Sequence, residues 1–529
     1  MEYNTMRNFR DRENDQYCAA MMVHETNTAR ELSDDFILPD YLPDVKKIVW
    51  VQAYPRLGNR FLGSGILEFE GAVAYKVLYI AEDNKVRCAA FLSDFKNKIE
   101  SDELGEDCVD ILTPVANQVV CRMQNPRKLN IRCKAGIEGA IWRRTSFMPE
   151  LYGARGGEEK NIETSECQVN ALNVTNRRES GLVFSEDITV ESSMPAIGEV
   201  ICSSADIYVD ECRPSGSELL LRGVCEMELI YSVTGSEKED YVLLHRTLPY
   251  SQSLDADTLK DGCCCRVKIM PEGVTVNVRE DEFGKRRMIE LDINYSLDIE
   301  AIHPKKIYYC RDCYSTDREC QTASEPKLIW HLEDGMRASF SVNENRVLKE
   351  LDCKELVEVK ACSAVPYMTL EEERGKKDRP VYSGTAKVTV LGVKEDGGYC
   401  TTAFEIPIRY ESDRPLPMKQ VKADVHCRAA GVRCRCDAEK LYVDFEVICS
   451  ANLLAANEAD CVQVIRMLPE KGREQEKGAV ATLYFPQAGE TMFDIAKKYK
   501  VARNSLMERN GLEKEDDMAG RALLIPKKR

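Results

Sequence analysis

At 529 residues, the chain is long enough for roughly three to five domains of ordinary size. Hydrophobic residues make up 43% of the sequence, which is enough for packed cores and excludes a collagen-like or largely disordered chain. The formal net charge of −16 argues against binding to the phosphate backbone of nucleic acids, because that binding requires a basic surface.

Charged side chains are spread through the N-terminal segment MEYNTMRNFRDRENDQYCAA, residues 1–20. A secretion signal would need an apolar core of about 7–15 residues there, and a membrane span would need about 18 consecutive apolar residues. The sequence contains neither. We therefore expect the protein to stay in the cytosol of the cell that makes it, with residues 1–30 as an N-terminal arm that is either helical or disordered.

Three segments farther along the chain are similar to one another. In each, a glycine (Gly71, Gly223 or Gly384) opens a strand that β-forming residues largely fill. The three glycines are 152 and 161 residues apart. The aligned strands cover residues 70–79, 222–231 and 383–392.

The residues on either side of these strands keep the same order in each copy. Each copy ends on an alternating strand, at 129–134, 289–294 and 441–446. The upstream matches are Val45, Ile48, Val49 and Ala53 with Ile197, Val200, Ile201 and Ala205, and with Leu356, Val359 and Ala364. Chance would not preserve several anchors in one order, so we infer three copies of one unit.

Apolar and polar residues alternate with a period of two in each copy, which is typical of antiparallel strands with one buried face. Polar breaks at 82–84, 234–236 and 395–398 predict hairpin turns. We therefore predict a mainly β fold with three tandem antiparallel β-sandwich or barrel-like repeats, over residues 31–165, 166–325 and 326–478. The polar segments at 158–161 and 316–319 are expected to be linkers.

The anchors of the three copies resemble the SPOCS domain, over about residues 31–455. That domain is found in endospore-forming Firmicutes, in proteins linked to the spore coat. The third copy departs from the pattern, because Lys354 stands where Pro43 and Pro195 stand in the others, and Gly392 replaces the tyrosine that ends the strand. We infer that the third copy has lost whatever the other two bind.

The last segment, residues 479–529, is predicted to form a small βααβ domain. A strand at 483–486 leads to a turn at 489–491, and Thr491 is expected to cap a helix. A second helix ends at Asn510 and Gly511, and a strand at 522–526 follows. The expected core residues include Ile495, Ala496, Tyr499, Leu512 and Leu524. Residues 481–529 carry ten Lys or Arg against seven Asp or Glu, a net charge of +3 that leaves −19 for the rest of the chain.

The motifs G-E-T-M-x-x-I-A-x-x-Y, N-G-L and G-x-x-L-L-I-P resemble the LysM domain nearly throughout this segment. The resemblance implies a shallow groove between two loops, whose usual ligand is a glycan containing N-acetylglucosamine. The expected groove residues are Gly489, Glu490, Thr491, Met492, Phe493, Leu512, Glu513, Lys514, Asp516, Asp517 and Met518. The second loop is dense in acid and has no aromatic ring, which favours a protein partner bearing basic groups over a glycan; a merely solvated loop is the third alternative.

Several of the 23 cysteines, such as Cys225, Cys400 and Cys449, stand at apolar positions in predicted strands. We expect reduced thiols that act as small core residues, with cross-linking in an oxidising shell as the alternative. The best candidate metal ligands are Cys310, Cys313 and Cys320, near His303. A structural zinc site normally has a second paired knuckle, so no metal is expected.

Catalysis has few candidates in this sequence. The five histidines lie in no recognisable nucleophile or metal motif, and no Walker-type loop, G-x-S-x-G or H-E-x-x-H occurs. The three copies also leave no room for a catalytic domain, such as a wall hydrolase anchored by LysM. We expect a protein that is not an enzyme and needs no cofactor.

Tandem SPOCS-like copies followed by one LysM-like domain resemble a spore coat morphogenesis family of clostridia. The resemblance implies a protein of the mother-cell cytoplasm that joins the coat to the forespore surface. It also implies a LysM domain that engages stage IV sporulation protein A, the coat ATPase, through residues around Met492, Phe493 and 512–518. The alternative function is binding of cortex or cell-wall peptidoglycan; neither a nucleic acid nor a membrane span is expected.

Overall fold

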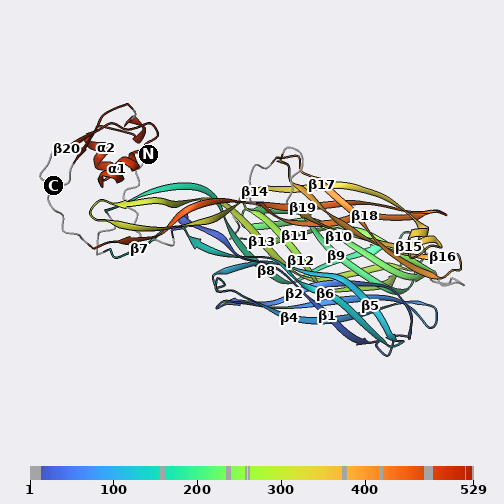
Figure 1. The fold of residues 1–529 in the computed structure, drawn as a ribbon. Helices are drawn as coiled ribbons and strands as arrows, with labels where there is room; N and C mark the ends of the chain where they lie inside the picture. Colours follow the sequence, from blue (N-terminus) through green and yellow to red (C-terminus); the bar gives the residue numbers. More distant parts are fainter. Residues whose placement is uncertain are drawn as a thin grey trace.

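The computed structural model describes residues 14–154, 161–233, 240–256, 259, 262–371, 378–415, 421–469, 481–518 and 520–526. Strands hold 76% of the residues and helices 5%, so the chain is mainly β, as the period-two alternation predicts. In Figure 1 the strands form an elongated body, and the two α-helices lie in a small C-terminal unit at one end of it. None of the helices in these described residues is long and apolar enough to cross a membrane.

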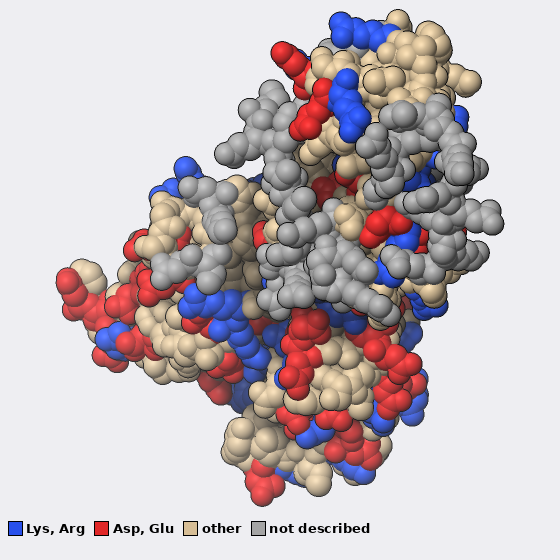
Figure 2. Space-filling model, turned by 90° about the vertical axis from the view of Figure 1, so that its left-hand side faces the viewer, with Lys and Arg blue, Asp and Glu red and all other residues tan. Residues whose placement is uncertain are grey.

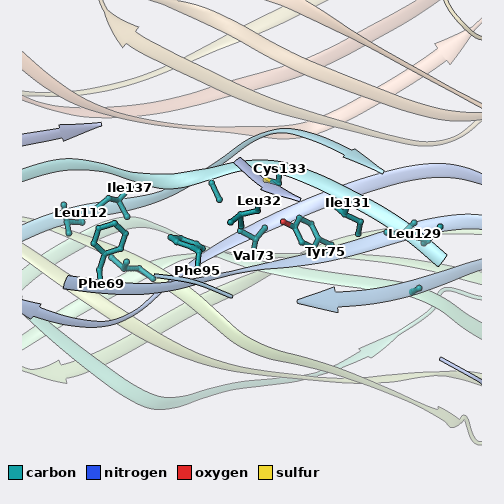
Figure 3. Close-up of a cluster of buried hydrophobic side chains, with 14 of the residues drawn as sticks. Leu32, Phe69, Val73, Tyr75, Phe95, Leu112, Leu129, Ile131, Cys133 and Ile137 are labelled. Carbon is teal, nitrogen blue, oxygen red and sulfur yellow. The ribbon is translucent and has the colours of Figure 1, made fainter. Parts of the chain in front are cut away.

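The first six long strands form two antiparallel sheets that pack face to face, and we call them unit one. Their strand orders are β2-β3-β4 and β1-β6-β5. The bounds are β1 (Cys18–Ile37), β2 (Val45–Gly63), β3 (Ile66–Ala81), β4 (Val86–Glu100), β5 (Cys108–Asn125) and β6 (Lys128–Ser146), after a short 3₁₀ turn, η1 (Asp15–Tyr17). Alternate residues of both sheets meet in one core, which includes Phe69, Val73, Tyr75 and Ile131 (Figure 3).

Unit two repeats this arrangement with the next long strands. Its sheets have the orders β11-β10-β9 and β12-β13-β8. The bounds are β8 (Ile162–Thr189), β9 (Ile197–Ser215), β10 (Glu218–Val233), β11 (Tyr241–Asp255), β12 (Cys264–Glu280) and β13 (Arg286–Ser315). Side chains from both sheets, such as Met227 and Leu291, form its core.

Unit three also has two sheets, of orders β15-β16-β17 and β14-β19-β18. The bounds are β14 (Cys320–Val347), η3 (Leu348–Glu350), β15 (Leu356–Leu370), β16 (Val381–Lys394), β17 (Tyr399–Glu411), β18 (Val421–Cys436) and β19 (Lys440–Met467). A short strand, β7 (Glu150–Tyr152), pairs with β19 in parallel. The core of unit three contains Val388 and Val443.

The aligned sequence segments occupy corresponding places in the three units. Residues 70–79, 222–231 and 383–392 lie in β3, β10 and β16, and each of these is the middle strand of its sheet. The closing segments lie in β6, β13 and β19, which are the middle strands of the second sheets. Each of these middle strands is hydrogen-bonded to a neighbour on both sides, and one face of its sheet is turned toward the core of its unit.

Two hydrophobic clusters join the units to one another. In the first, Leu78, Ile230 and Leu391 meet, and each lies seven residues after the glycine of its copy. In the second, which we call the junction core, Ala20 of β1, Leu172 of β8 and Trp330 of β14 meet beside Trp142. In both clusters, corresponding positions of the three units are in contact. The units are therefore arranged around a shared centre and are not separate domains in a row.

The structure tests several of the expected turns and connections. The breaks at 82–84 and 395–398 do connect hairpin strands, with Asn84 (φ 63°) and Gly397 (φ 80°) in the left-handed region. The break at 234–236 lies outside the described residues. Residues 316–319, expected as a linker, connect β13 of unit two to β14 of unit three, and the Thr316 amide donates to the carbonyl of Asn161 (2.8 Å). Residues 158–160 of the other expected linker are not among those described.

The start of the body differs from the expected arm. Residues 18–30, placed by the sequence in an N-terminal arm, are part of β1 and pair with β6. The expected boundaries at 165/166 and 325/326 fall within β8 and β14, close to where each strand begins.

The cysteines are partly as expected. Cys225 and Cys449 are buried free thiols in core positions. Cys400 is a correction, because it forms a disulfide with Cys353, whose Cα lies 5.8 Å away, within the usual range for this bond.

Candidate functional site

The C-terminal unit consists of a two-stranded antiparallel sheet and two helices. Its elements are β20 (Ala481–Tyr484), α1 (Met492–Tyr499), α2 (Arg503–Arg509), η5 (Glu515–Met518) and β21 (Leu523–Pro526). Thr491 caps α1 as predicted: its hydroxyl accepts from the amide of Asp494, and the Asp494 carboxylate accepts from the amide of Thr491 (2.9 Å). Helix α2 ends before Asn510, and Gly511 follows with φ 60°.

The core of this unit contains most of the residues that the helical spacing predicts. Ile495, Ala496 and Leu512 are buried, and Tyr499 packs against them from a partly buried position. Leu524 was expected in the core, and this is wrong, because its side chain is 44% exposed. In β21 the neighbours Leu523 and Ile525 point inward, and the period of two turns Leu524 outward.

The two expected groove loops do come together in the structure. Met492, Phe493, Leu512 and Met518 all belong to the same buried cluster, so these four side chains hold the loops side by side. Their burial corrects their expected role as contact residues, because Met492 is fully buried and Phe493 is 5% exposed. The groove residues at the surface are Gly489, Thr491, Glu513 and Lys514, while the side chains of Asp516 and Asp517 lie outside the described part of the chain.

Glu490, another expected groove residue, binds within the unit itself. Its carboxylate accepts hydrogen bonds from the Tyr484 hydroxyl (2.8 Å) and from the Gln487 amide (2.8 Å). The Gln487 amide and the Tyr484 hydroxyl hold the pKa of Glu490 below its usual range. The Glu490 carboxylate therefore holds the loop before α1 against β20. This structural role could not be predicted from the position of Glu490 in the sequence.

The C-terminal unit rests on residues of the body that we call the seat: Glu163 of β8, Asp312 and Tyr314 of β13, and Glu319. The Tyr314 ring meets the Phe493 ring edge-on, with centroids 5.3 Å apart. The Tyr314 hydroxyl donates to the carbonyl of Val501 (2.8 Å) in a buried bond, and burial raises the pKa of Tyr314. Tyr314 is thus part of the core of a unit that begins 167 residues after it in the sequence.

Three ion pairs surround this aromatic contact. Lys497 pairs with Asp312 (2.6 Å) and Lys500 pairs with Glu319 (3.1 Å). Arg503 pairs with Glu163 (3.1 Å), and its guanidinium also lies 5.6 Å from the centroid of the Phe493 ring. Every pair joins a base of the C-terminal unit to an acid of the body.

Sequence reasoning missed the seat, although one signal pointed to it. The C-terminal segment is basic and the rest of the chain is acidic, and oppositely charged surfaces of one chain attract each other. Figure 2 views the molecule from this end, with acidic and basic side chains interspersed over the body and the C-terminal unit at the top. Charge asymmetry alone gives no position for Tyr314, because no local pattern links it to Phe493.

The candidate metal ligands do not form a site in the structure. Cys310 and Cys313 are buried in a small apolar cluster with Val462 and Ile465, and Cys320 lies at its edge. His303 contacts the Thr175 hydroxyl through Nε2 (3.0 Å). Over the described residues, no group of three or more His, Cys, Asp or Glu is arranged to hold a metal ion.

One segment of the chain matches a known family model. Residues 196–279 match the family model described as SipL, SPOCS domain. The match runs from the start of β9 nearly to the end of β12, within unit two. It supports a SipL-like protein and points to sporulation. No curated protein and no solved structure matches the chain.

Proposed function

We propose that this protein is a non-enzymatic scaffold for assembly of the spore coat, and that its three units are three SPOCS-like copies. Its C-terminal unit acts as a LysM domain that docks onto stage IV sporulation protein A, the coat ATPase, at the forespore surface. The protein works from the mother-cell cytoplasm. The observation that carries the proposal is the match of residues 196–279 to the SPOCS domain of SipL.

The arrangement of the units supports a scaffold. Three similar two-sheet units around a shared centre offer repeated surfaces, and such surfaces gain avidity on a polymeric partner without strong single contacts. The C-terminal unit differs from them in fold and in charge, which suits a separate docking role. Its βααβ order and the capping box at Thr491 support the LysM resemblance.

The surface residues of the two groove loops are where we expect the partner to bind. Glu513 and Lys514 are exposed there, whereas Met492 and Phe493 are buried. Reversing the charge of Glu513 with Glu513→Arg should weaken capture of the ATPase by about five-fold or more, because rim charges set the encounter and register of a complex. The measurement is co-precipitation of the purified full chain with the purified ATPase.

Glu508→Arg is the matched control, because it makes the same charge change on the exposed face of α2. It should leave capture within about two-fold of the unmodified chain, as a charge outside the contact has little effect. A fluorescent fusion of the unmodified chain should form a shell around the forespore in sporulating cells. Diffuse fluorescence, or no capture of the ATPase by the unmodified chain, would refute the proposed function.

Binding of peptidoglycan is the second candidate, and one observation favours it. Phe485, which directly follows β20, is 68% exposed, and an exposed ring at the groove could stack on a sugar. This candidate predicts that the protein sediments with purified peptidoglycan and that Phe485→Ala abolishes the sedimentation. Unchanged sedimentation of that variant would rule out stacking by this ring.

A further inference from the structure

A cavity of about 500 Å³ lies where the three units meet. Unit one lines it with Thr26, Glu138 and Trp142, and unit two with Leu172 and Ile302. Unit three closes the other side with Tyr367, Lys422, Asp424 and Leu454. A volume of about 300–1,000 Å³ is typical of sites for small organic ligands. The cavity requires all three units, so it forms only in the assembled body.

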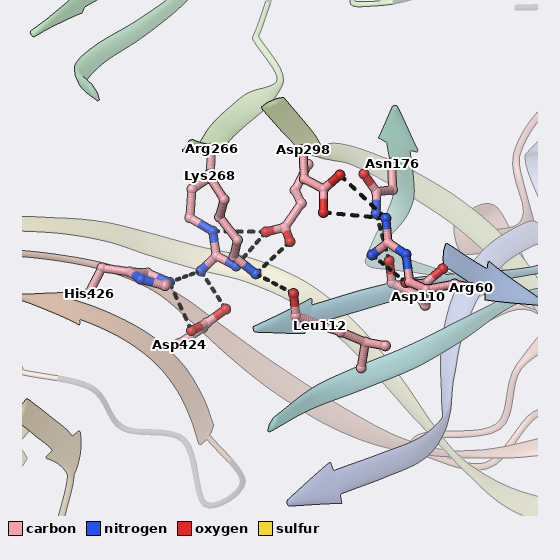
Figure 4. Close-up of polar contacts among 10 residues, drawn as sticks. Arg60, Asp110, Leu112, Asn176, Arg266, Lys268, Asp298, Asp424 and His426 are labelled. Atoms are coloured by element: carbon pink, nitrogen blue, oxygen red, sulfur yellow. Dashed lines mark hydrogen bonds and ion pairs between the residues drawn. The ribbon is translucent and has the colours of Figure 1, made fainter. Parts of the chain in front are cut away.

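Most of the charged groups around this cavity neutralise one another. Arg266 pairs with Asp424 and with Glu300, whose other oxygen accepts from Lys268 (2.7 Å). Figure 4 shows this network, with Asp424 and His426 of unit three beside Arg266 and Lys268 of unit two. At another wall Lys422 pairs with Glu25. Arg266, Lys268 and Lys422 therefore already form ion pairs with carboxylates of the protein.

Glu138 is different from the other carboxylates that line the cavity. Within the described part of the chain it forms no ion pair, and its side chain is only partly exposed. Burial raises the pKa of Glu138, and the nearby Asp424 carboxylate adds to this effect, while Lys268 opposes it. An ionised carboxylate in such a place is costly unless a cation approaches it.

The register of β6 places the Glu138 side chain on the cavity side of its sheet. Neighbouring residues of a strand point to opposite faces, so Glu138 shares a face with Ala140 and Trp142, which line the cavity. Ile137 and Ile141 lie on the other face, in the core of unit one.

The other walls are apolar. Trp142, Leu172, Val174 and Ile302 belong to the junction core and face the cavity together, and Leu454 packs against them. A ligand that satisfies the whole surface must combine a positive group with an apolar body. A hydrated metal ion or an anion would leave either the apolar walls or Glu138 without a partner.

We propose that the cavity binds a small organic ammonium ion with an apolar body. The ammonium group donates to the Glu138 carboxylate, and the apolar body lies against Trp142, Leu172 and Ile302. This hydrogen bond is strengthened by the charges of both groups. This site is separate from the C-terminal unit, so it does not depend on the proposed coat partner.

Calorimetric titration of the full chain with 2-phenylethylamine tests this proposal. We expect saturable binding of one molecule per chain. The neutral analogue 2-phenylethanol and the anion 3-phenylpropanoate should bind at least about ten-fold more weakly, because each lacks the charge-assisted hydrogen bond. Equal affinity for the three compounds, or no binding of the amine to the unmodified chain, would overturn it.

Two variants locate the ammonium group. Glu138→Gln should weaken binding of the amine by about ten-fold and leave the neutral analogue unchanged. Glu68→Gln makes the same change of charge at an exposed position of β3 and should bind the amine like the unmodified chain. If Glu138→Gln folds with full affinity for the amine, the proposed site is wrong; if it fails to fold, the three-compound comparison in the unmodified chain still decides.

Discussion

The aligned glycine of each unit lies inside β3, β10 or β16 rather than at the start of the strand, and it is needed because a neighbouring group occupies the space of a side chain. A Cβ on Gly223 would overlap the backbone carbonyl of Tyr208, and one on Gly384 would overlap the carbonyl of Tyr367. A Cβ on Gly71 would meet the ring of Phe95 instead. Glycine is therefore required at all three positions. A backbone carbonyl leaves no room for a side chain at Gly223 and Gly384, and an aromatic ring leaves none at Gly71.

Gly223→Ala should therefore destabilise the chain by about 1–3 kcal/mol, the usual cost of forcing an extra carbon into a packed site. Thermal unfolding followed by circular dichroism measures this loss. The control is Gly335→Ala on β14, where a Cβ would meet nothing within 4 Å. That substitution should be neutral or slightly stabilising. Equal melting temperatures for the two variants would show that the close approach at Gly223 is not limiting.

A second residue, Asp206 of β9, makes stability depend on pH. Burial raises the pKa of Asp206, Glu226 directly opposite on β10 adds to this, and Lys76 of unit one opposes it. Between the ordinary pKa of the unfolded carboxyl and the raised pKa of the folded one, the folded state holds a proton that the unfolded state has released. Stability from this group therefore falls as the pH rises through that interval.

Asp206→Asn should raise stability at pH 7 by on the order of 1 kcal/mol, since the amide cannot acquire the buried charge. The gain should shrink as the pH is lowered toward the ordinary pKa of aspartate, where both side chains are neutral. Melting temperatures across this pH range measure the difference. Asp210→Asn, on the same strand, removes a carboxylate that pairs with Arg428 (3.1 Å) and should give no gain. A pH-independent gain for Asp206→Asn would contradict this account.

At the scale of elements, the strands that join the units are longer than the sequence pattern indicates. The closing segment of unit two was predicted over residues 289–294, whereas β13 covers Arg286–Ser315. Its first part has the alternation of a strand with one buried face, but residues such as Ser296, Asp298 and Glu300 are also buried, because another unit covers the second face. A period-two pattern describes one buried face, so it identifies the first part of β13 and not the part at the junction.

The candidate site also depends on two kinds of contact. The sequence predicts its local contacts but not those between residues far apart in the chain. The cap of α1 and the end of α2 depend on residues within one turn, and the sequence predicted both. The burial of Phe493 depends on Tyr314, which is 179 residues away in the chain. Since nothing local encodes that contact, Phe493 was interpreted as a residue of an open groove.

We expect the seat to hold the C-terminal unit in its position on the body. Tyr314→Ala removes both the ring contact with Phe493 and the hydrogen bond to Val501. Exposed ion pairs contribute only about 0–1 kcal/mol each, so the remaining three should not hold the unit in place. We expect a larger radius of gyration by small-angle scattering and faster amide exchange in α1. Tyr41→Ala, at a residue that is 84% exposed, should change neither quantity, and an unchanged radius for Tyr314→Ala would mean that the seat is not the main attachment.

At the scale of the whole molecule, the junction core makes the three units depend on one another. Trp330 of unit three is 5% exposed and packs edge-on against Trp142 of unit one, with ring centroids 6.5 Å apart. Leu172 and Ile302 of unit two complete the same cluster. A unit that lost this contact would expose apolar surface from its neighbours as well as its own, so we expect the units to unfold together.

Trp330→Ala should therefore lower the free energy of unfolding by about 3–5 kcal/mol. It should also raise the rate of amide hydrogen exchange in all three units. The matched control is Leu229→Ala, which creates a cavity in the core of unit two alone. Leu229→Ala should lower the free energy of unfolding by about 2–5 kcal/mol, a loss similar to that of Trp330→Ala. The two variants should differ in which units are destabilised. For Leu229→Ala we expect the increase in exchange to be largest in β8 to β13. If exchange in the Trp330 variant rose only in unit three, the units would be independent, and a cavity built from all three of them could not respond as one site.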